Sequence, residues 1–326
     1  MRRLPRLLAS ALLVLPLAAC GSDDSPTEEA QTPSGPWSFT DDLGQTVELD
    51  ETPVRIAAYG DAGAALWNFG ITPVAIFHYM DPAEDPTFED LDLSETDVIG
   101  TQYGEINLEQ LAAAQPDLIV TTTYDGDTPE TMYGFKDEAQ LAKVTDIAPV
   151  VGIEQSGSAI DVIERNEELA QSLGVDTGEG SDVAADRAAF EEASEALTEA
   201  ASEGRTVLPM YAEDSGLYVV IAQDDPAMAY FAELGVRFEE TGGKDDYYWE
   251  ILSWENADRY EPDLVLNSQR GSYSTEQLEE QPVFGSLAAV EAGQVHPWKF
   301  TSMDYPSLTS YMEELAGWLT TDRDVA

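Results

Sequence analysis

One short pattern occurs twice in the chain, and this repeat constrains the fold more than any other feature of the sequence. Glu109 precedes Pro116 by seven residues, and Glu255 precedes Pro262 by the same spacing. In both copies Pro-Asp-Leu opens an apolar run, and the copies are offset by 146 residues. Pro-Asp is also a common join between a helix and a strand, so the pattern can arise without a repeat. We expect two lobes of similar α/β build, each containing this helix-to-strand unit.

Apolar runs alternate with helical segments on both sides of this pattern. Residues 37–49 alternate between apolar and polar, which predicts a β-hairpin that turns at Asp42-Leu43-Gly44. Strands separated by helices are typical of a mostly parallel α/β sheet. The predicted strands include 54–59, 71–77, 118–120, 264–266 and 294–298, and the predicted helices are 62–69 and segments led by Asn107 and Ser253.

Two helical segments lie between the copies of the repeat. The first covers 159–173 and ends at Gly174, and the second covers 181–202 and ends at Gly204. We expect one of them to cross from lobe to lobe as a stiff strut, and we favour the first. The expected divisions are an N-terminal lobe over 37–156, a linking helix over 157–175 and a C-terminal lobe over 176–326.

The first twenty residues have the pattern of a secretory signal. Arg2, Arg3 and Arg6 precede an apolar stretch over 7–17, which as a helix of about 16 Å is too short to cross a bilayer. Cys20 ends a Leu-Ala-Ala-Cys motif that resembles the lipobox of bacterial lipoproteins, in which the thiol receives a diacylglycerol. The alternative is an ordinary signal peptide that contains a cysteine. We expect a signal peptide over 1–19, a lipidated Cys20 and a flexible tether over 20–36.

The charge and size of the remaining chain exclude some classes of function. Without residues 1–19 the chain keeps twelve basic and 64 acidic side chains, a formal net charge of −52. Such a surface repels nucleic acid, because binding there depends on neutralising phosphates. We attribute this acidity to solubility or a salty habitat before any role in ligand binding. A body of roughly 290 residues is large for one core and suits two lobes.

In order, the chain contains the Cys20 motif, Gly70-Ile-Thr-Pro, the two repeat copies and a Phe-Gly-Ser-Leu-Ala-Ala-Val-Glu-Ala-Gly-Gln-Val-His segment over 284–296. This ordered set resembles the periplasmic-binding-protein family that serves importers of iron–siderophores, heme and cobalamin. The resemblance covers nearly all of residues 37–320. It implies an α/β fold of two Rossmann-like lobes with mostly parallel sheets, joined by a single long helix, with a ligand cleft between the lobes. It also implies that the lobes close only slightly on the ligand.

The resemblance also implies a role for the repeated glutamates. In this family an acidic residue on each lobe pairs with arginines of the permease dimer, and Glu109 and Glu255 stand at the matching positions. Two exposed carboxylates on pseudo-symmetric lobes would suit a two-fold partner, and carboxylate–arginine pairing can be bidentate. The alternative is that both are ordinary acids in the first turn of a helix, where they favour the helix dipole.

Parallel α/β sheets bind ligands beyond the carboxyl ends of their strands, so residues that follow predicted strands are candidates for the cleft. Arg270 and Lys299 are two such residues near aromatic ones, and they would neutralise an anionic chelate or bond its oxygens. Tyrosine and tryptophan supply flat apolar faces with a polar tip, which suits a hydroxamate, catecholate or mixed siderophore. Each residue taken singly is as readily a packing or loop residue. The expected ligand-binding residues are Tyr59, Tyr79, Tyr103, Tyr124, Tyr211, Trp249, Arg270, Tyr273 and Lys299.

Direct metal capture and catalysis are not expected. The chain has two histidines, His78 and His296, too few for the histidine-rich sites of manganese and zinc binders. His296 is expected to be structural, whereas His78 with Tyr79 would suit a heme iron. The chain lacks Gly-x-Ser-x-Gly, a P-loop, His-Glu-x-x-His and Gly-x-Gly-x-x-Gly after a strand, so no catalytic residue is assigned. The alternative is a pair of acids of the glycosidase type, since the chain has 64 acidic side chains.

The sequence therefore predicts an extracytoplasmic, lipid-anchored, monomeric solute-binding protein that delivers a ferric siderophore to the permease dimer and ATPase of an ABC importer. No cofactor is expected, and iron enters only as part of the chelate. The chain would meet the membrane through its lipid anchor alone and would not bind nucleic acid. The alternatives are heme or cobalamin as the ligand, or a ligand-sensing lipoprotein at the cell surface.

Overall fold

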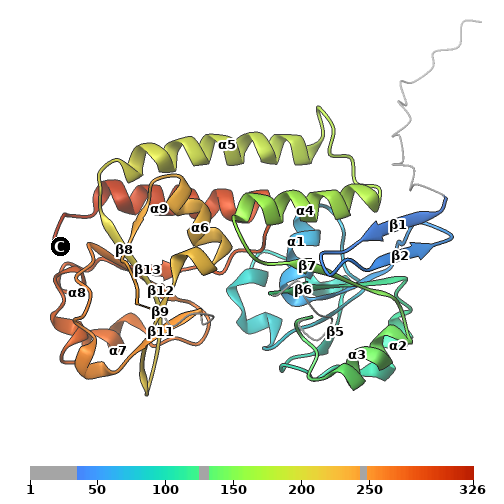
Figure 1. The fold of residues 1–326 in the computed structure, drawn as a ribbon, viewed down its shortest axis with the longest axis horizontal. Helices are drawn as coiled ribbons and strands as arrows, with labels where there is room; N and C mark the ends of the chain where they lie inside the picture. Colours follow the sequence, from blue (N-terminus) through green and yellow to red (C-terminus); the bar gives the residue numbers. More distant parts are fainter. Residues whose placement is uncertain (1–34, 125–131, 243–247) are drawn as a thin grey trace, which may run out of the picture. The chain divides into compact units, whose positions relative to one another are not determined.

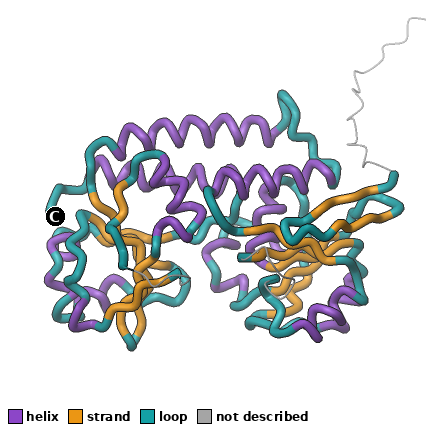
Figure 2. The backbone as a smooth tube through the Cα atoms, in the orientation of Figure 1, coloured by secondary structure: helices purple, strands orange, loops and turns teal. Residues whose placement is uncertain are grey.

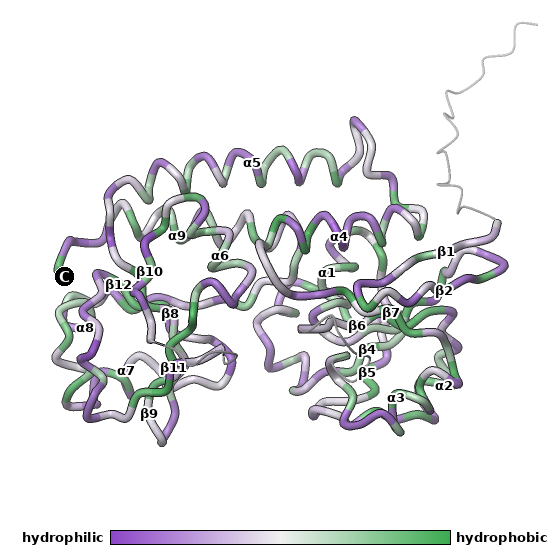
Figure 3. The backbone as a smooth tube through the Cα atoms, in the orientation of Figure 1, coloured by the Kyte–Doolittle hydropathy of each residue, from purple (hydrophilic) through white to green (hydrophobic). Residues whose placement is uncertain are grey.

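The computed structural model of the chain describes residues 35–124, 132–242 and 248–326, all within the unit Pro33–Ala326. This unit contains two α/β lobes, each with its own sheet, as predicted from the sequence (Figure 1). The strands of the two sheets form separate groups, with long helices along one side of both (Figure 2). Hydrophobic stretches follow the strands (Figure 3), as expected for sheets that are covered on both faces.

The sheet of the N-terminal lobe has five parallel strands in the order β5-β4-β3-β6-β7. Its first strand, β3, lies at the centre, so the strand order reverses there. Open α/β sheets bind ligands at such a reversal, outside the carboxyl ends of the strands. The elements of this lobe are β3 (Ile56–Tyr59), α1 (Gly60–Asn68), β4 (Ala75–Phe77), β5 (Asp97–Gly100), α2 (Leu108–Ala114), β6 (Leu118–Thr123), α3 (Glu138–Thr145) and β7 (Val150–Glu154).

The predicted hairpin at the start of the lobe is confirmed. Strands β1 (Trp37–Thr40) and β2 (Thr46–Leu49) pair antiparallel, and the turn between them contains Asp42-Leu43-Gly44. The indole of Trp37 donates a hydrogen bond to the hydroxyl of Ser172 at 3.1 Å, which holds the hairpin against α4 (Ala159–Ser172).

The sheet of the C-terminal lobe is mixed, in the order β11-β9-β8-β12-β13, with β10 also paired to β8. Strands β10, β12 and β13 extend it in parallel, whereas β9 and β11 pair antiparallel. Its elements are β8 (Thr206–Glu213), β9 (Gly216–Val220), α6 (Pro226–Glu233), β10 (Arg237–Phe238), β11 (Trp249–Leu252), β12 (Leu264–Ser268), α7 (Thr275–Glu279), α8 (Ala288–Glu291) and β13 (Val295–Trp298).

One helix, α4, contributes buried residues to the hydrophobic cores of both lobes. Val162 and Leu169 of α4 pack in the core of the N-terminal lobe. Ala159 and Ile163 of the same helix pack in the core of the C-terminal lobe, together with residues of α5 and α9. A helix with one face in each core suits the predicted strut, although the boundaries given for the lobes and the linking helix remain predictions. These helices are α4 (Ala159–Ser172), α5 (Asp182–Ala201) and α9 (Tyr305–Thr321).

The aspartate of each Pro-Asp-Leu motif has the same structural role in both lobes. Asp117 accepts hydrogen bonds from the backbone N–H groups of Val54 and Arg55, just before β3, at 3.0 and 2.9 Å. Asp263 accepts one from Thr206, the first residue of β8, at 2.8 Å. In each lobe the strand that the motif opens pairs in parallel with the strand whose start the aspartate holds. This shared function explains why the pattern occurs twice.

The second copy differs from the prediction in one respect, because the helix expected from Ser253 does not form. The chain makes only a 3-10 turn, η6 (Trp254–Asn256). In the first copy the Asn107 side chain accepts two backbone N–H bonds from the first turn of α2, whereas Ser253 makes no such cap. The indole of Trp254 instead donates to the backbone oxygen of Glu213 at 3.2 Å and fixes the turn against the sheet.

Candidate functional site

A cavity of about 1090 Å³ lies between the two lobes. The N-terminal lobe contributes residues that end or follow β3, β4 and β6, and the C-terminal lobe contributes residues around β8, β9, β11 and β12. This is the region in which the strand-end rule places a ligand. Six of the nine expected ligand-binding residues line the cavity: Tyr59, Tyr79, Tyr124, Tyr211, Trp249 and Arg270.

The other three expected residues are not among the described residues that line the cavity. Tyr103 is half exposed and packs edge-on against Tyr133, with ring centroids 5.0 Å apart. Tyr273 stacks on Trp254, and its hydroxyl donates to the carboxylate of Asp214. Tyr103 therefore lies behind a lining residue, Tyr133, whereas Tyr273 is held by neighbours that do not line the cavity.

Lys299 also lies outside the cavity lining. Its ammonium group pairs with Glu314 of α9 at 2.6 Å. The positive charge of Lys299, which was expected to bind an anionic ligand, is thus already neutralised by Glu314.

The cavity has further lining residues that the sequence analysis did not select. Tyr218 lies on β9, an antiparallel strand to which the strand-end rule for parallel sheets does not apply. Tyr248 directly precedes Trp249, so its position next to a selected aromatic residue was an available signal. Further lining residues that the sequence analysis did not select are Tyr133, Glu213, Asp224 and Asp225.

Arg270 makes ion pairs that join the two lobes. Its guanidinium follows β12 of the C-terminal lobe and lies 2.7 Å from Asp61 and 3.1 Å from Asp85, both in the N-terminal lobe. It also donates to the hydroxyl of Thr87 at 2.8 Å. Burial lowers the pKa of Arg270, but the two carboxylates raise it by more, so the group stays protonated. Arg270 therefore acts first as a contact between lobes.

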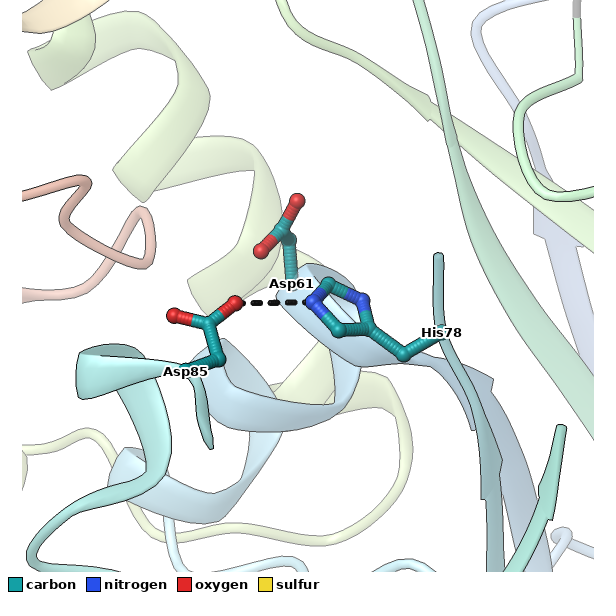
Figure 4. Close-up of side chains that lie close together, drawn as sticks. All are labelled: Asp61, His78 and Asp85. Carbon is teal, nitrogen blue, oxygen red and sulfur yellow. Dashed lines mark hydrogen bonds and ion pairs between the residues drawn. The ribbon is translucent and has the colours of Figure 1, made fainter. Parts of the chain in front are cut away.

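Asp85 is held in its charged form behind this contact. Its Oδ2 lies 2.8 Å from Nε2 of His78, and neither side chain is exposed (Figure 4). Burial raises the pKa of Asp85, but the hydrogen bond with His78 and the charge of Arg270 outweigh it, so the pKa lies well below its ordinary value. Removing one partner of such a buried pair typically costs about 3–5 kcal/mol of stability.

The cluster of Asp61, His78 and Asp85 has the composition of a cation site. Their ligand atoms lie within 4.8 Å of one another (Figure 4). Both carboxylates already pair with Arg270, however, so the protein supplies the counter-cation itself. Nδ1 of His78 faces Gly60, where a Cβ atom would stand only 2.2 Å away. This nitrogen is buried against the backbone and has no hydrogen-bond partner among the described residues, and His78 does not belong to the described lining of the cavity.

Tyr59 presents a hydroxyl group without a partner. Its side chain is 1% exposed and lines the cavity, and within the described part of the chain its Oη makes no hydrogen bond. Burial raises the pKa of Tyr59 well above its ordinary value, so the phenol remains a neutral donor. Its ring packs edge-on against Tyr133 at 5.2 Å, which fixes its direction. An acceptor atom of a ligand would satisfy this donor.

The opposite wall combines aromatic rings with a carboxylate. Tyr211, Tyr218 and Trp249, here called the aromatic cluster, lie within 5.7–6.5 Å of one another between ring centroids. Glu213 accepts hydrogen bonds from the hydroxyls of Ser215 at 2.7 Å and Tyr218 at 2.8 Å. These two bonds lower the pKa of Glu213, so a charged oxygen stands beside the rings at neutral pH.

The two glutamates of the repeat are both exposed. Glu109 lies in the first turn of α2 in the N-terminal lobe, and Glu255 lies in the turn η6 of the C-terminal lobe. Neither lines the cavity among the described residues, so both are free of the contacts that hold the ligand site.

The sequence model of the periplasmic binding protein family matches residues 57–301, which include most of both lobes and most of the residues that line the cavity. The chain belongs to this family. Members of the family bind solutes outside the cytoplasm, and the cleft between two α/β lobes agrees with that class. No curated protein sequence matches the chain significantly.

Solved structures give the same fold. DesE, a ferric-siderophore receptor protein from Streptomyces coelicolor, is 31% identical with a TM-score of 0.81, over 89% of this chain and all of that one. The siderophore periplasmic binding protein from the fuscachelin gene cluster of Thermobifida fusca is 25% identical with a TM-score of 0.62, over 82% and 96% of the two chains. The petrobactin-binding protein YclQ from Bacillus subtilis is 16% identical with a TM-score of 0.68, over 88% and 99%.

The expected lipidation site, Cys20, lies outside the described residues, as do the predicted signal peptide and most of the tether. Across the described part of the chain, no helix has both the length and the apolar character needed to span a membrane.

Proposed function

We propose that the chain binds a ferric siderophore outside the cytoplasm and delivers it to an ABC importer. The observation that carries this proposal is the 31% identity to a ferric-siderophore receptor over 89% of the chain. The siderophore-binding protein at 25% identity supports the same class of ligand. A cavity walled by tyrosine and tryptophan, with hydroxyl donors for chelate oxygens, agrees with it chemically.

We further propose that the protein is a carrier without catalytic activity or cofactor, and that iron enters the site only within its chelate. The ion pairs of Arg270 with Asp61 and Asp85 support the proposal that no free metal ion binds there, since the guanidinium already neutralises these carboxylates.

The remaining parts of the proposal concern partners and place. The Leu-Ala-Ala-Cys motif supports a lipid on Cys20, which would hold a monomeric protein on the outer face of the cell membrane by the tether over 20–36. The exposed Glu109 and Glu255, one on each lobe, support docking on arginines of the permease dimer, whose ATPase drives import.

Fluorescence titration of the purified chain tests the ligand class. Trp249 lies in the cavity wall, so a bound ferric chelate should quench tryptophan emission in a saturable way. The panel would contain ferric hydroxamates, ferric catecholates, heme and cobalamin, with calorimetry as the second method. Saturation by one ferric chelate class supports the proposal. Saturation by heme or cobalamin alone would replace the ligand, and silence across the panel by both methods would refute the proposal.

A further inference from the structure

The charges around the cavity differ from those that an anionic chelate would require. Arg270, the expected ligand-binding cation, already pairs with two carboxylates of the other lobe. An anionic ligand would have to compete with these pairs and leave Asp85 buried without its guanidinium partner. Among the described residues that line the cavity, the charged ones are Arg270 and the acids Asp61, Glu213, Asp224 and Asp225.

The wall that contains Glu213 has the chemistry of a site for a cationic group. The faces of tyrosine and tryptophan rings attract ammonium groups, and a carboxylate beside them strengthens that attraction. Glu213 is bonded by the hydroxyl of Tyr218, a member of the aromatic cluster, and Tyr211 of the same cluster has its hydroxyl 3.5 Å from the other carboxylate oxygen. The rings and the charge therefore belong to one hydrogen-bonded group.

The wall that contains Tyr59 favours a hydrogen-bond acceptor on the ligand instead of a positive charge. Its buried and unpartnered hydroxyl can donate to an oxygen of the ligand, and no described residue supplies that acceptor. A ligand that fits both walls has oxygen acceptors at one end and a positive charge at the other. An iron chelate with oxygen donors and a free amine has this arrangement.

We propose that Glu213 and the aromatic cluster form a subsite for the ammonium group of a cationic ferric chelate, while Tyr59 donates to an oxygen beside the iron. This inference rests on the proposed function and adds to it the charge of the ligand. It replaces the expectation, made from the sequence, that Arg270 and Lys299 neutralise an anionic chelate.

Two ferric chelates that differ by one charge test the inference on the unmodified chain. Ferrioxamine B is a linear trihydroxamate with a protonated terminal amine, and its N-acetylated derivative keeps the iron coordination but loses the charge. We expect the amine form to bind roughly tenfold more tightly at low ionic strength, as one cation–π and carboxylate contact predicts. The preference should shrink in high salt, because salt screens exposed charges.

The variant Glu213→Gln keeps the size of the side chain and an oxygen acceptor for the Tyr218 hydroxyl. We expect it to abolish the preference by weakening only the amine form, with the affinity of the acetylated form unchanged. Glu291→Gln, at an exposed position of α8 away from the cavity, is the matched control and should keep the full preference.

Equal affinities of the two chelates in the unmodified chain would overturn the inference and leave the proposed function standing. Tighter binding of an anionic ferric tricatecholate than of either trihydroxamate would have the same consequence. A preference that survives in Glu213→Gln would remove Glu213 from the subsite. If no ferric chelate binds, whatever its charge, the proposed function is refuted. This result differs from the outcomes above, in all of which at least one chelate binds.

Discussion

Tyr59 provides a test of the ligand site at the scale of one atom. A buried hydroxyl without a hydrogen-bond partner costs the folded chain about 1–3 kcal/mol, so its removal should not destabilise the ligand-free protein. We therefore expect Tyr59→Phe to unfold at the same or a higher urea concentration than the unmodified chain. The ferric chelate should bind about tenfold less tightly to this variant, since one hydrogen bond to the ligand is lost.

Urea denaturation without ligand and calorimetry with the chelate measure these two effects separately. Tyr79→Phe, which alters another tyrosine of the cavity lining, serves as the comparison. A loss of stability in Tyr59→Phe with unchanged affinity would show that the hydroxyl serves the fold and not the ligand.

The residues of the site were predictable only in part, for a physical reason. The strand-end rule follows from the topology of parallel sheets, and it found Tyr59, Tyr124 and Arg270 because each ends or follows a parallel strand. It cannot say what a side chain pairs with across the fold. Lys299 is neutralised by Glu314 of α9, and Arg270 by acids far from it in the chain, and no local pattern records either contact.

At the scale of elements, α9 begins at a carboxylate that joins the two lobes. Asp304 caps this helix by accepting from the N–H of Ser307 at 2.8 Å, and it also accepts from the side-chain amide of Asn68 in α1 at 2.9 Å. Asp304 is fully buried. Burial raises its pKa to about 6, although hydrogen bonds from Asn68, Ser302 and Ser307 oppose the shift.

This pKa predicts how Asp304 affects stability as pH changes. A carboxyl whose pKa is higher in the folded than in the unfolded chain binds its proton more tightly when folded. Stability from this group is therefore present at low pH and is lost as the pH rises from about 4 through about 6. Relative to Asp304→Asn, we expect the unmodified chain to be more stable at pH 4.5 than at pH 7.5 by about 2 kcal/mol.

Urea denaturation of both proteins at the two pH values measures this difference, and subtracting one protein from the other removes the titration of the other acids. Asp324→Asn, at an exposed position, is the control and should show no such dependence. A difference of the opposite sign would mean that Asp304 is held in its charged form.

Elements were predicted best where a local signal and the fold agree. The helix predicted from Asn107 forms, because the Asn107 side chain accepts hydrogen bonds from two backbone N–H groups of its first turn. The helix expected from Ser253 carried the same spacing but lacked the cap. The indole of Trp254 found backbone acceptors on a neighbouring hairpin, and only a 3-10 turn remained. The spacing between Glu255 and Pro262 therefore predicted the start of the following strand correctly, where Asp263 bonds the neighbouring strand. It did not predict whether a helix precedes that strand.

At the scale of the whole molecule, Arg270 should contribute to stability because it links the lobes. Arg270→Gln would leave Asp61 and the buried Asp85 without their cation, and we expect a loss of about 3–5 kcal/mol in the free energy of unfolding. Lys299→Gln is a matched control, because it breaks a half-exposed pair with Glu314 that is worth less than about 1 kcal/mol. Urea denaturation measures both, and similar losses in the two variants would contradict a special role for Arg270.

The two-lobed architecture also sets how the protein meets its importer. The repeat was recognisable from sequence because an aspartate at the same position of each copy holds the central strand of its lobe. The repeat also places one exposed glutamate on each lobe.

If both glutamates dock on permease arginines, the double variant Glu109→Arg and Glu255→Arg should abolish uptake of iron-loaded chelate in cells, because like charges would then meet at both contacts. The affinity of the purified variant for the chelate should stay unchanged, since neither residue lines the cavity. Glu279→Arg with Glu291→Arg changes the net charge equally at other exposed positions and should leave uptake intact. Normal uptake in the first double variant would show that the glutamates are ordinary first-turn acids. Loss of uptake in both would attribute the effect to net charge rather than to docking.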